Sequence, residues 1–177
     1  MRLLKRQFGA SFVRVFSLSP TLVADLAECR RLGVRIRLVP GKTEGYTIPS
    51  SKVIGIGTRG TRSYRLTALA HEMYHVLYGT APLETVPKGM TRHRFISLLL
   101  EEETNSFVHE LKVVHELLSA GVRFGNGEMR WYRRWRRGGR KAIRKMVAES
   151  QSAVTGELYP VYYGRLYDEA VAAGKVA

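Results

Sequence analysis

The chain has 177 residues, of which 45% are hydrophobic and 25% are charged, and its formal net charge at pH 7 is +14. This length and composition are typical of one globular domain with a true core, and the single cysteine excludes a disulfide framework or a cysteine-based zinc ribbon. The excess of positive charge favours partners that carry phosphate groups or acidic surfaces.

We expect neither a membrane-spanning helix nor a signal peptide. The chain has no apolar run of about 18 residues, which is the length that a transmembrane helix needs. Arg14 interrupts the hydrophobic stretch near the N-terminus, and no small-x-small cleavage site follows it. These features predict a cytoplasmic protein.

Hydrophobic periodicity and chain-breaking residues divide the chain into predicted elements. Ser19 and Pro20 are typical of the N-cap and first position of a helix, and Gly33 is typical of its end. In chain order we predict a strand or irregular arm over 8–16, a helix over 20–32, strands over 34–39, 46–48 and 52–56, and helices over 64–78, 91–120, 128–150 and 167–173. This order predicts an α+β fold, in which a small three-stranded antiparallel sheet packs on helices.

Residues 71–75 read His-Glu-Met-Tyr-His, an HExxH motif inside the predicted helix 64–78. Four residues advance an α-helix by about 400°, so His71 and His75 project from nearly the same side, one turn apart. Imidazole nitrogens at this spacing can bind one zinc ion, and Glu72 is placed to act on a water as general base. The alternative is a pair of surface histidines, but the apolar residues of this helix favour a buried one.

A catalytic zinc needs a third protein ligand and an open position for water. The candidates that follow the motif are His93, the triplet Glu101, Glu102 and Glu103, and His109. Because Glu101 and Asn105 are four residues apart on one helical face, we expect Glu101 to bind zinc and Asn105 to hydrogen-bond His71. A solvated helix start is the alternative interpretation of the three glutamates.

Two segments resemble the ImmA/IrrE-type metallopeptidases. Residues 66–75, Leu-Thr-Ala-Leu-Ala-His-Glu-Met-Tyr-His, are similar to that family's "fTlaHElgH" segment. Residues 101–108, Glu-Glu-Glu-Thr-Asn-Ser-Phe-Val, resemble its "E-x-x-A-N-x-F-A" segment, although Thr104 replaces the usual alanine, and 52–56 resembles its edge strand. The resemblance implies a zincin-like core, a protein substrate such as a DNA-bound regulator, and a site with zinc ligands His71, His75 and Glu101 and the general base Glu72.

Two rival interpretations stay open. The motif is also similar to the "HEMxH" of SprT-like proteases, which act on protein crosslinked to DNA and would use His93 as third ligand, although the glycine after that histidine is missing. The other rival is a non-catalytic nucleic-acid-binding or assembly protein on a degenerate zincin core.

For catalysis, we expect an extended substrate to add to the strand 52–56. Candidate donors to the oxyanion are Tyr46, Tyr74, Tyr162 and Tyr163.

Residues 130–145 carry nine positive side chains and no acidic one. Aromatic side chains interleaved with arginines are typical of nucleic-acid surfaces. The predicted contacts are Arg130, Trp131, Arg133, Arg134, Trp135, Arg136, Arg137, Arg140 and Lys141. An anionic membrane, an acidic partner, or a helix with core tryptophans and solvated arginines would show the same pattern. We therefore predict a single domain over 1–177, with a zincin-like core over 20–120 and a basic helical extension over 128–177 that has a break at Gly138 and Gly139.

Overall fold

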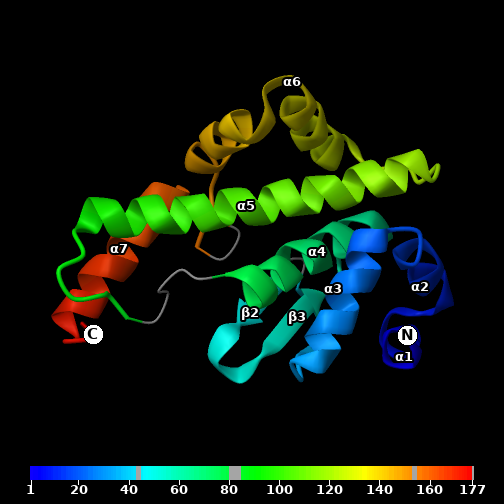
Figure 1. The fold of residues 1–177 in the computed structure, drawn as a ribbon, viewed down its shortest axis with the longest axis horizontal. Coiled ribbons are helices and arrows are strands. Elements are labelled where there is room, and N and C mark those ends of the chain that lie inside the picture. Colours follow the sequence, from blue (N-terminus) through cyan, green and yellow to red (C-terminus); the bar gives the residue numbers. More distant parts are fainter. Residues whose placement is uncertain (43–44, 80–84, 153–154, 177) are drawn as a thin grey trace.

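The computed structural model describes residues 1–42, 45–79, 85–152 and 155–176. Within these residues the chain is mixed α+β, as predicted, with seven α-helices and a three-stranded sheet (Figure 1). The helices are α1 (Arg2–Phe8), α2 (Ala10–Phe16), α3 (Pro20–Arg31), α4 (Arg62–Tyr78), α5 (Arg92–Ser119), α6 (Asn126–Ala148) and α7 (Tyr159–Ala172). The strands are β1 (Arg35–Val39), β2 (Gly45–Ile48) and β3 (Val53–Gly57), with a 3-10 helix (Pro49–Ser51) between β2 and β3.

The N-terminal segment is helical, so the predicted strand or irregular arm over 8–16 is wrong. Gly9, with φ 87°, separates α1 from α2. Phe8, Phe12 and Phe16 are spaced by four residues, and their rings stack with centroids 4.6 and 6.3 Å apart. All three rings enter the core, Phe12 and Phe16 from one side of α2 and Phe8 from the end of α1.

The sheet is mixed rather than antiparallel. Its strand order is β1-β3-β2, in which β1 pairs with β3 in parallel and β2 pairs with β3 antiparallel. Every residue of β3 is buried, and both of its sides are paired. The strand expected at the edge, 52–56, is therefore the central one, and β2 lies at an edge of the sheet.

Helix α5 runs along the longest axis of the molecule (Figure 1) and contributes side chains to two hydrophobic clusters. The first contains side chains from α1 to α3, the sheet, α4 and the C-terminal part of α5. The second contains side chains from the N-terminal part of α5, α6 and α7. The 28 residues of α5 extend over about 42 Å, so its middle lies against α4 between the two clusters.

Helix α6 bends at the predicted break. Gly139 has φ 57° and ψ −153°, a backbone conformation that is essentially restricted to glycine.

No single helix in the described part of the chain is long and apolar enough to cross a membrane. Helices α2 and α3 taken together have the necessary length and composition, but they are bent by 109° relative to each other.

A buried polar cluster joins three helices. Asp25 of α3, only 3% exposed, lies 2.7 Å from Nε2 of His109 on α5 and accepts a 3.1 Å hydrogen bond from the hydroxyl of Tyr78 on α4. We expect Asp25→Ala to lower the free energy of unfolding by roughly 1.5–3 kcal/mol, because the largely buried imidazole of His109 would lose its partner, whereas the half-exposed Tyr78 can turn its hydroxyl to water.

Urea denaturation followed by circular dichroism measures this loss. The matched control is Asp168→Ala, since Asp168 is 57% exposed and pairs with Arg92 at the surface. That change should cost at most about 1 kcal/mol. Equal costs for the two variants would contradict the structural role of Asp25.

Candidate metal centre

Helix α4 presents the two histidines of the motif toward α5. Its N-cap is Thr61, whose side chain accepts a hydrogen bond from the backbone N–H of Tyr64. Its opposite side is buried in the first cluster through Leu66, Leu69 and Met73. The Nε2 atoms of His71 and His75 lie 3.2 Å apart, so the structure brings the two predicted ligands together.

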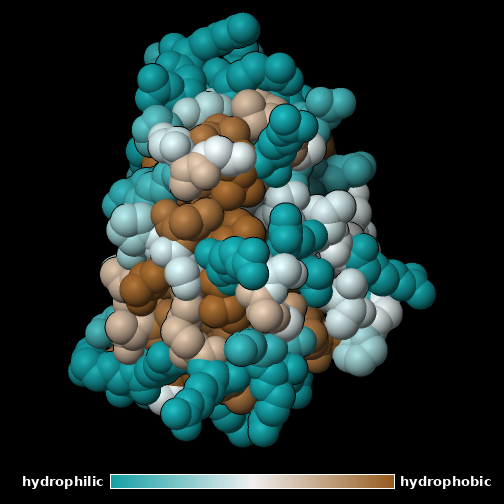
Figure 2. Space-filling view, turned by 90° about the vertical axis from the view of Figure 1, so that its right-hand side faces the viewer, coloured by the Kyte–Doolittle hydropathy of each residue, from teal (hydrophilic) through white to brown (hydrophobic). Residues whose placement is uncertain are grey.

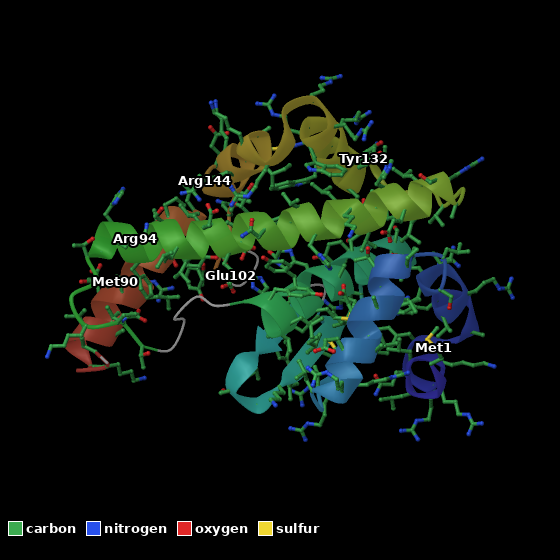
Figure 3. All side chains as sticks on the ribbon, viewed as in Figure 1. Met1, Met90, Arg94, Glu102, Tyr132 and Arg144 are labelled. Atoms are coloured by element: carbon green, nitrogen blue, oxygen red, sulfur yellow. The ribbon has the colours of Figure 1, made fainter. Side chains whose placement is uncertain are left out.

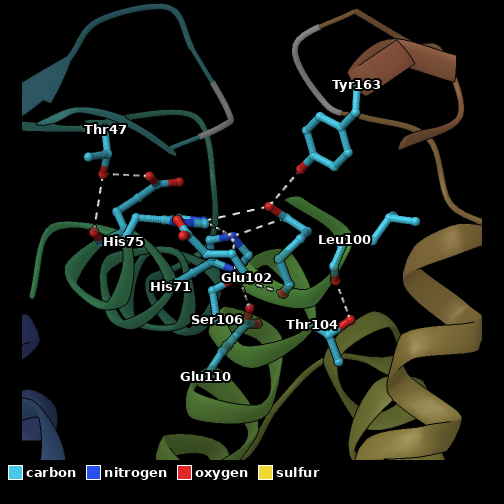
Figure 4. Close-up of polar contacts among 11 residues, drawn as sticks. Thr47, His71, His75, Leu100, Glu102, Thr104, Ser106, Glu110 and Tyr163 are labelled. Carbon is cyan, nitrogen blue, oxygen red and sulfur yellow. Dashed lines mark hydrogen bonds and ion pairs between the residues drawn. The ribbon is translucent and has the colours of Figure 1, made fainter. Parts of the chain in front are cut away.

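Glu103 of α5 completes the group. Its Oε1 lies 3.2 Å from Nε2 of His71, and its Oε2 lies 3.6 Å from Nε2 of His75. One ligand atom from each of the three side chains lies within 4.8 Å of the others, which is close enough for all three to hold one metal ion. Tyr163 of α7 donates a 3.2 Å hydrogen bond to Oε2 of Glu103 and fixes this carboxylate (Figure 4).

Carboxylates also hold the far nitrogen of each imidazole. Nδ1 of His75 lies 3.0 Å from Glu102, and Nδ1 of His71 lies 3.4 Å from Glu110 (Figure 4). Such contacts orient metal-binding imidazoles and make them more basic. They leave both Nε2 atoms pointing to the same point in space, which is the orientation that a shared ion requires.

The structure corrects the predicted roles of Glu101 and Asn105. The carboxylate of Glu101 pairs with Arg140 and Arg144 of α6, and Asn105 accepts a 2.9 Å hydrogen bond from Nε of Arg140. Two residues turn an α-helix by about 200°, so Glu101 faces α6 while Glu103 faces α4. Glu103 therefore takes the place expected for Glu101, and Glu110 takes that of Asn105.

The other histidines lie elsewhere. His93 is exposed in the first turn of α5, ten residues before Glu103, which is about 15 Å along the helix axis. The structure therefore does not support His93 as the third ligand. His109 pairs with Asp25, and Nδ1 of His115 lies 2.8 Å from the hydroxyl of Tyr132.

Glu72 is buried and turned toward β2. Its Oε2 accepts a 2.8 Å hydrogen bond from the hydroxyl of Thr47, which lies on β2. A Cβ added at Gly45 would lie 3.0 Å from Cγ of Glu72, so a glycine allows β2 to approach this side chain closely. The sequence does not predict Thr47 or Gly45 as site residues, because both lie near Glu72 only when β2 pairs with β3 and packs against α4.

The site is strongly anionic although the chain is basic. Glu72, Glu102, Glu103 and Glu110 surround the two histidines. Burial lowers the pKa of His71, but the charge and hydrogen bond of Glu103 outweigh it and hold that pKa well above its usual value. Burial raises the pKa of Glu103, but the two histidines outweigh it and lower that pKa to about 2. Burial raises the pKa of Glu72, which is the direction that suits a general base.

A cavity of about 440 Å³ opens beside the histidines. One wall is β2, and the others are aromatic side chains of α4 to α7: Tyr64, Phe107, Trp131, Tyr159, Tyr162 and Tyr163. Phe107 meets His71 edge-on at 4.7 Å and stacks on Trp131 at 4.5 Å. The cavity therefore joins the ionisable group to a large aromatic surface.

Three of the four predicted oxyanion donors line this cavity, namely Tyr46, Tyr162 and Tyr163. The fourth, Tyr74, packs instead against Tyr78 and His109. The hydroxyl of Tyr46 accepts a hydrogen bond from Arg37, and that of Tyr163 donates to Glu103. Tyr162 is therefore the best placed of the four to serve a substrate.

Comparison of the chain with protein-family models, with curated proteins and with solved structures found no match.

Proposed function

We propose that the chain is a zinc-dependent metallopeptidase with a zincin-like core, in which His71, His75 and Glu103 hold Zn²⁺ and Glu72 is the general base. The geometry of the three ligands supports this most strongly. Four ligands at about 2.0 Å from a tetrahedral zinc ion are about 3.3 Å apart. Nε2 of His71 lies 3.2 Å from Nε2 of His75 and 3.2 Å from Oε1 of Glu103, while Oε2 of the same carboxylate lies 3.6 Å from Nε2 of His75. Two histidines with one glutamate are also a donor set of catalytic zinc sites.

The residues around the site suit hydrolysis of a peptide bond. Zinc, when bound, supplies the Lewis acidity for a water nucleophile. Glu72 accepts the proton of this water and returns it to the leaving nitrogen. Thr47 holds the Glu72 carboxylate by donating to its Oε2. Tyr162 lies on the cavity wall, where its hydroxyl can donate to the developing oxyanion.

The substrate is an extended segment of protein. Strand β2 lies at the edge of the sheet, and Gly45, Tyr46 and Thr47 line the cavity, so a peptide that pairs with β2 runs past the histidines. The aromatic walls favour an apolar or aromatic side chain in that peptide. The ImmA/IrrE resemblance adds a DNA-bound regulator as a candidate substrate, with the ligand at Glu103 instead of Glu101.

Metal removal tests the proposal. The protein expressed in zinc-containing medium should carry stoichiometric zinc and hydrolyse an unstructured protein such as casein. Orthophenanthroline should abolish hydrolysis, and added zinc should restore it, because the water nucleophile loses its activation without the metal. Circular dichroism confirms that the chelated chain stays folded. Stoichiometric zinc without hydrolysis of casein or a peptide library would favour the non-catalytic alternative instead.

A further inference from the structure

Outside the metal centre, helix α6 forms a second concave site. The bend at Gly139 brings the two halves of the helix toward each other around a cleft of about 390 Å³. We call this the arginine cleft, and its lining residues are Arg130, Arg133, Arg134, Arg137, Met146 and Glu149. The four arginines follow the spacing i, i+3, i+4 and i+7, so they share one face over about 10 Å of helix.

In the part of the chain that the structure describes, the cleft arginines form no ion pairs with carboxylates, unlike the neighbouring arginines of α6. Arg140 and Arg144 are tied to Glu101, but in the described ranges no carboxylate forms an ion pair with any of the four cleft arginines. Glu149 is the one acid among the lining residues, and it pairs with Lys145. The cleft therefore concentrates positive charge that the fold itself does not balance.

The aromatic side chains of α6 face inward. Trp131 stacks on Phe107. Tyr132, labelled on α6 in Figure 3, has its hydroxyl 2.8 Å from Nδ1 of His115 on α5. Trp135 packs against Tyr132 and His115. Trp131 and Trp135 therefore belong to the packing between α5 and α6, which corrects their predicted role as a surface that stacks on bases. The remaining predicted contacts Arg136 and Lys141 are exposed outside the cleft.

This arrangement argues against a membrane surface. A helix that lies on a membrane needs an apolar face turned to the lipid. None of the large hydrophobic side chains exposed in the described structure belongs to α6. The top of the molecule, where α6 lies, is covered by hydrophilic residues on the face that Figure 2 shows.

We infer that the arginine cleft binds the phosphodiester backbone of nucleic acid without reading its base sequence. Guanidinium groups pair with phosphate through two parallel hydrogen bonds. A DNA duplex carries one negative charge per about 1.7 Å, so about 10 Å of helix meets several phosphates at once. Base sequence is read by hydrogen bonds to the base edges, whereas pairing with phosphate carries no sequence information, so these contacts do not discriminate between sequences. This inference is independent of the proposed hydrolysis.

Fluorescence anisotropy with a labelled random-sequence duplex and a single strand tests the cleft at several salt concentrations. Four phosphate contacts predict a slope of log K against log salt of about −3.6 on duplex DNA. The triple variant Arg133→Gln/Arg134→Gln/Arg137→Gln should flatten the slope to about −0.9 and weaken binding at least about tenfold at low salt. Wild-type affinity should be the same for duplexes of different sequence.

The matched control is Arg2→Gln/Arg6→Gln/Arg14→Gln, which removes the same charge from exposed positions on α1 and α2. It should retain the wild-type slope and affinity. The inference is overturned if the wild type does not bind either probe at low salt, or if both triple variants lose affinity equally. Tighter binding to phosphatidylserine vesicles or to polyglutamate than to DNA would also overturn it.

Discussion

Replacing Glu72 by glutamine is expected to leave zinc bound and to slow peptide hydrolysis by about 10²–10⁴-fold. The amide has nearly the shape of the carboxylate, and its oxygen can still accept the hydrogen bond from Thr47. It cannot accept a proton from water, so the general base is lost. Glu72 is not one of the three side chains that could hold a metal ion, so the metal content should not change.

The matched control is Glu128→Gln on α6, which removes the same charge from the same cavity. Glu128 lies near Ser63 of α4, with 3.5 Å between the two side-chain oxygens. Hydrolysis of casein and zinc content, measured on the same preparations, should stay within a few-fold of wild type in this control. Full activity of Glu72→Gln would exclude Glu72 as general base, and loss of its zinc would show that it is a ligand.

The sequence predicted the elements whose determinants are local. The cap formed by Ser19 and Pro20, the helical spacing of His71 and His75, and the break at Gly139 all depend on residues within one or two turns. The order of strands in the sheet depends on pairing between distant segments. The alternation in β1 and the apolar run of β3 do not show that the two strands are parallel neighbours, or that β2 is an edge strand. In the N-terminal segment, the break at Gly9 divides two short helices, so the spacing of their apolar residues also fits a strand or an irregular arm.

In the site, the prediction of Glu101 as third ligand failed because adjacent residues of α5 point in different directions around the helix. Glu101, Glu102 and Glu103 are adjacent in sequence, but they point in three directions, toward α6, His75 and both histidines respectively. The buried Leu99 and the half-buried Phe107 lie four residues on either side of Glu103, and this apolar stripe favours Glu103 over its two neighbours as the inward-facing glutamate. No sequence pattern identifies Thr47 as a site residue, because it contacts Glu72 only when β2 packs beside α4.

The three adjacent glutamates predict a graded loss of zinc when each is changed to glutamine. Glu103→Gln removes one of the three proposed ligands, so zinc affinity should fall by more than about a hundredfold, and hydrolysis should fall with it. Glu102→Gln weakens the contact that orients His75, for which a loss of about 10–100-fold in affinity is expected. Glu101→Gln touches only Arg140 and Arg144, so it should leave zinc affinity unchanged and cost at most about 1 kcal/mol of stability.

Competition with a zinc-binding dye measures the three affinities, and thermal unfolding of the zinc-free proteins confirms that each variant folds. Each substitution removes one negative charge from the same turn of α5, so a general electrostatic effect would lower the three affinities alike. An order in which Glu101→Gln loses zinc and Glu103→Gln retains it would restore the ligand set expected from the sequence. The graded order can arise only if the helical phase directs Glu103 to the ion, Glu102 to His75 and Glu101 away from both.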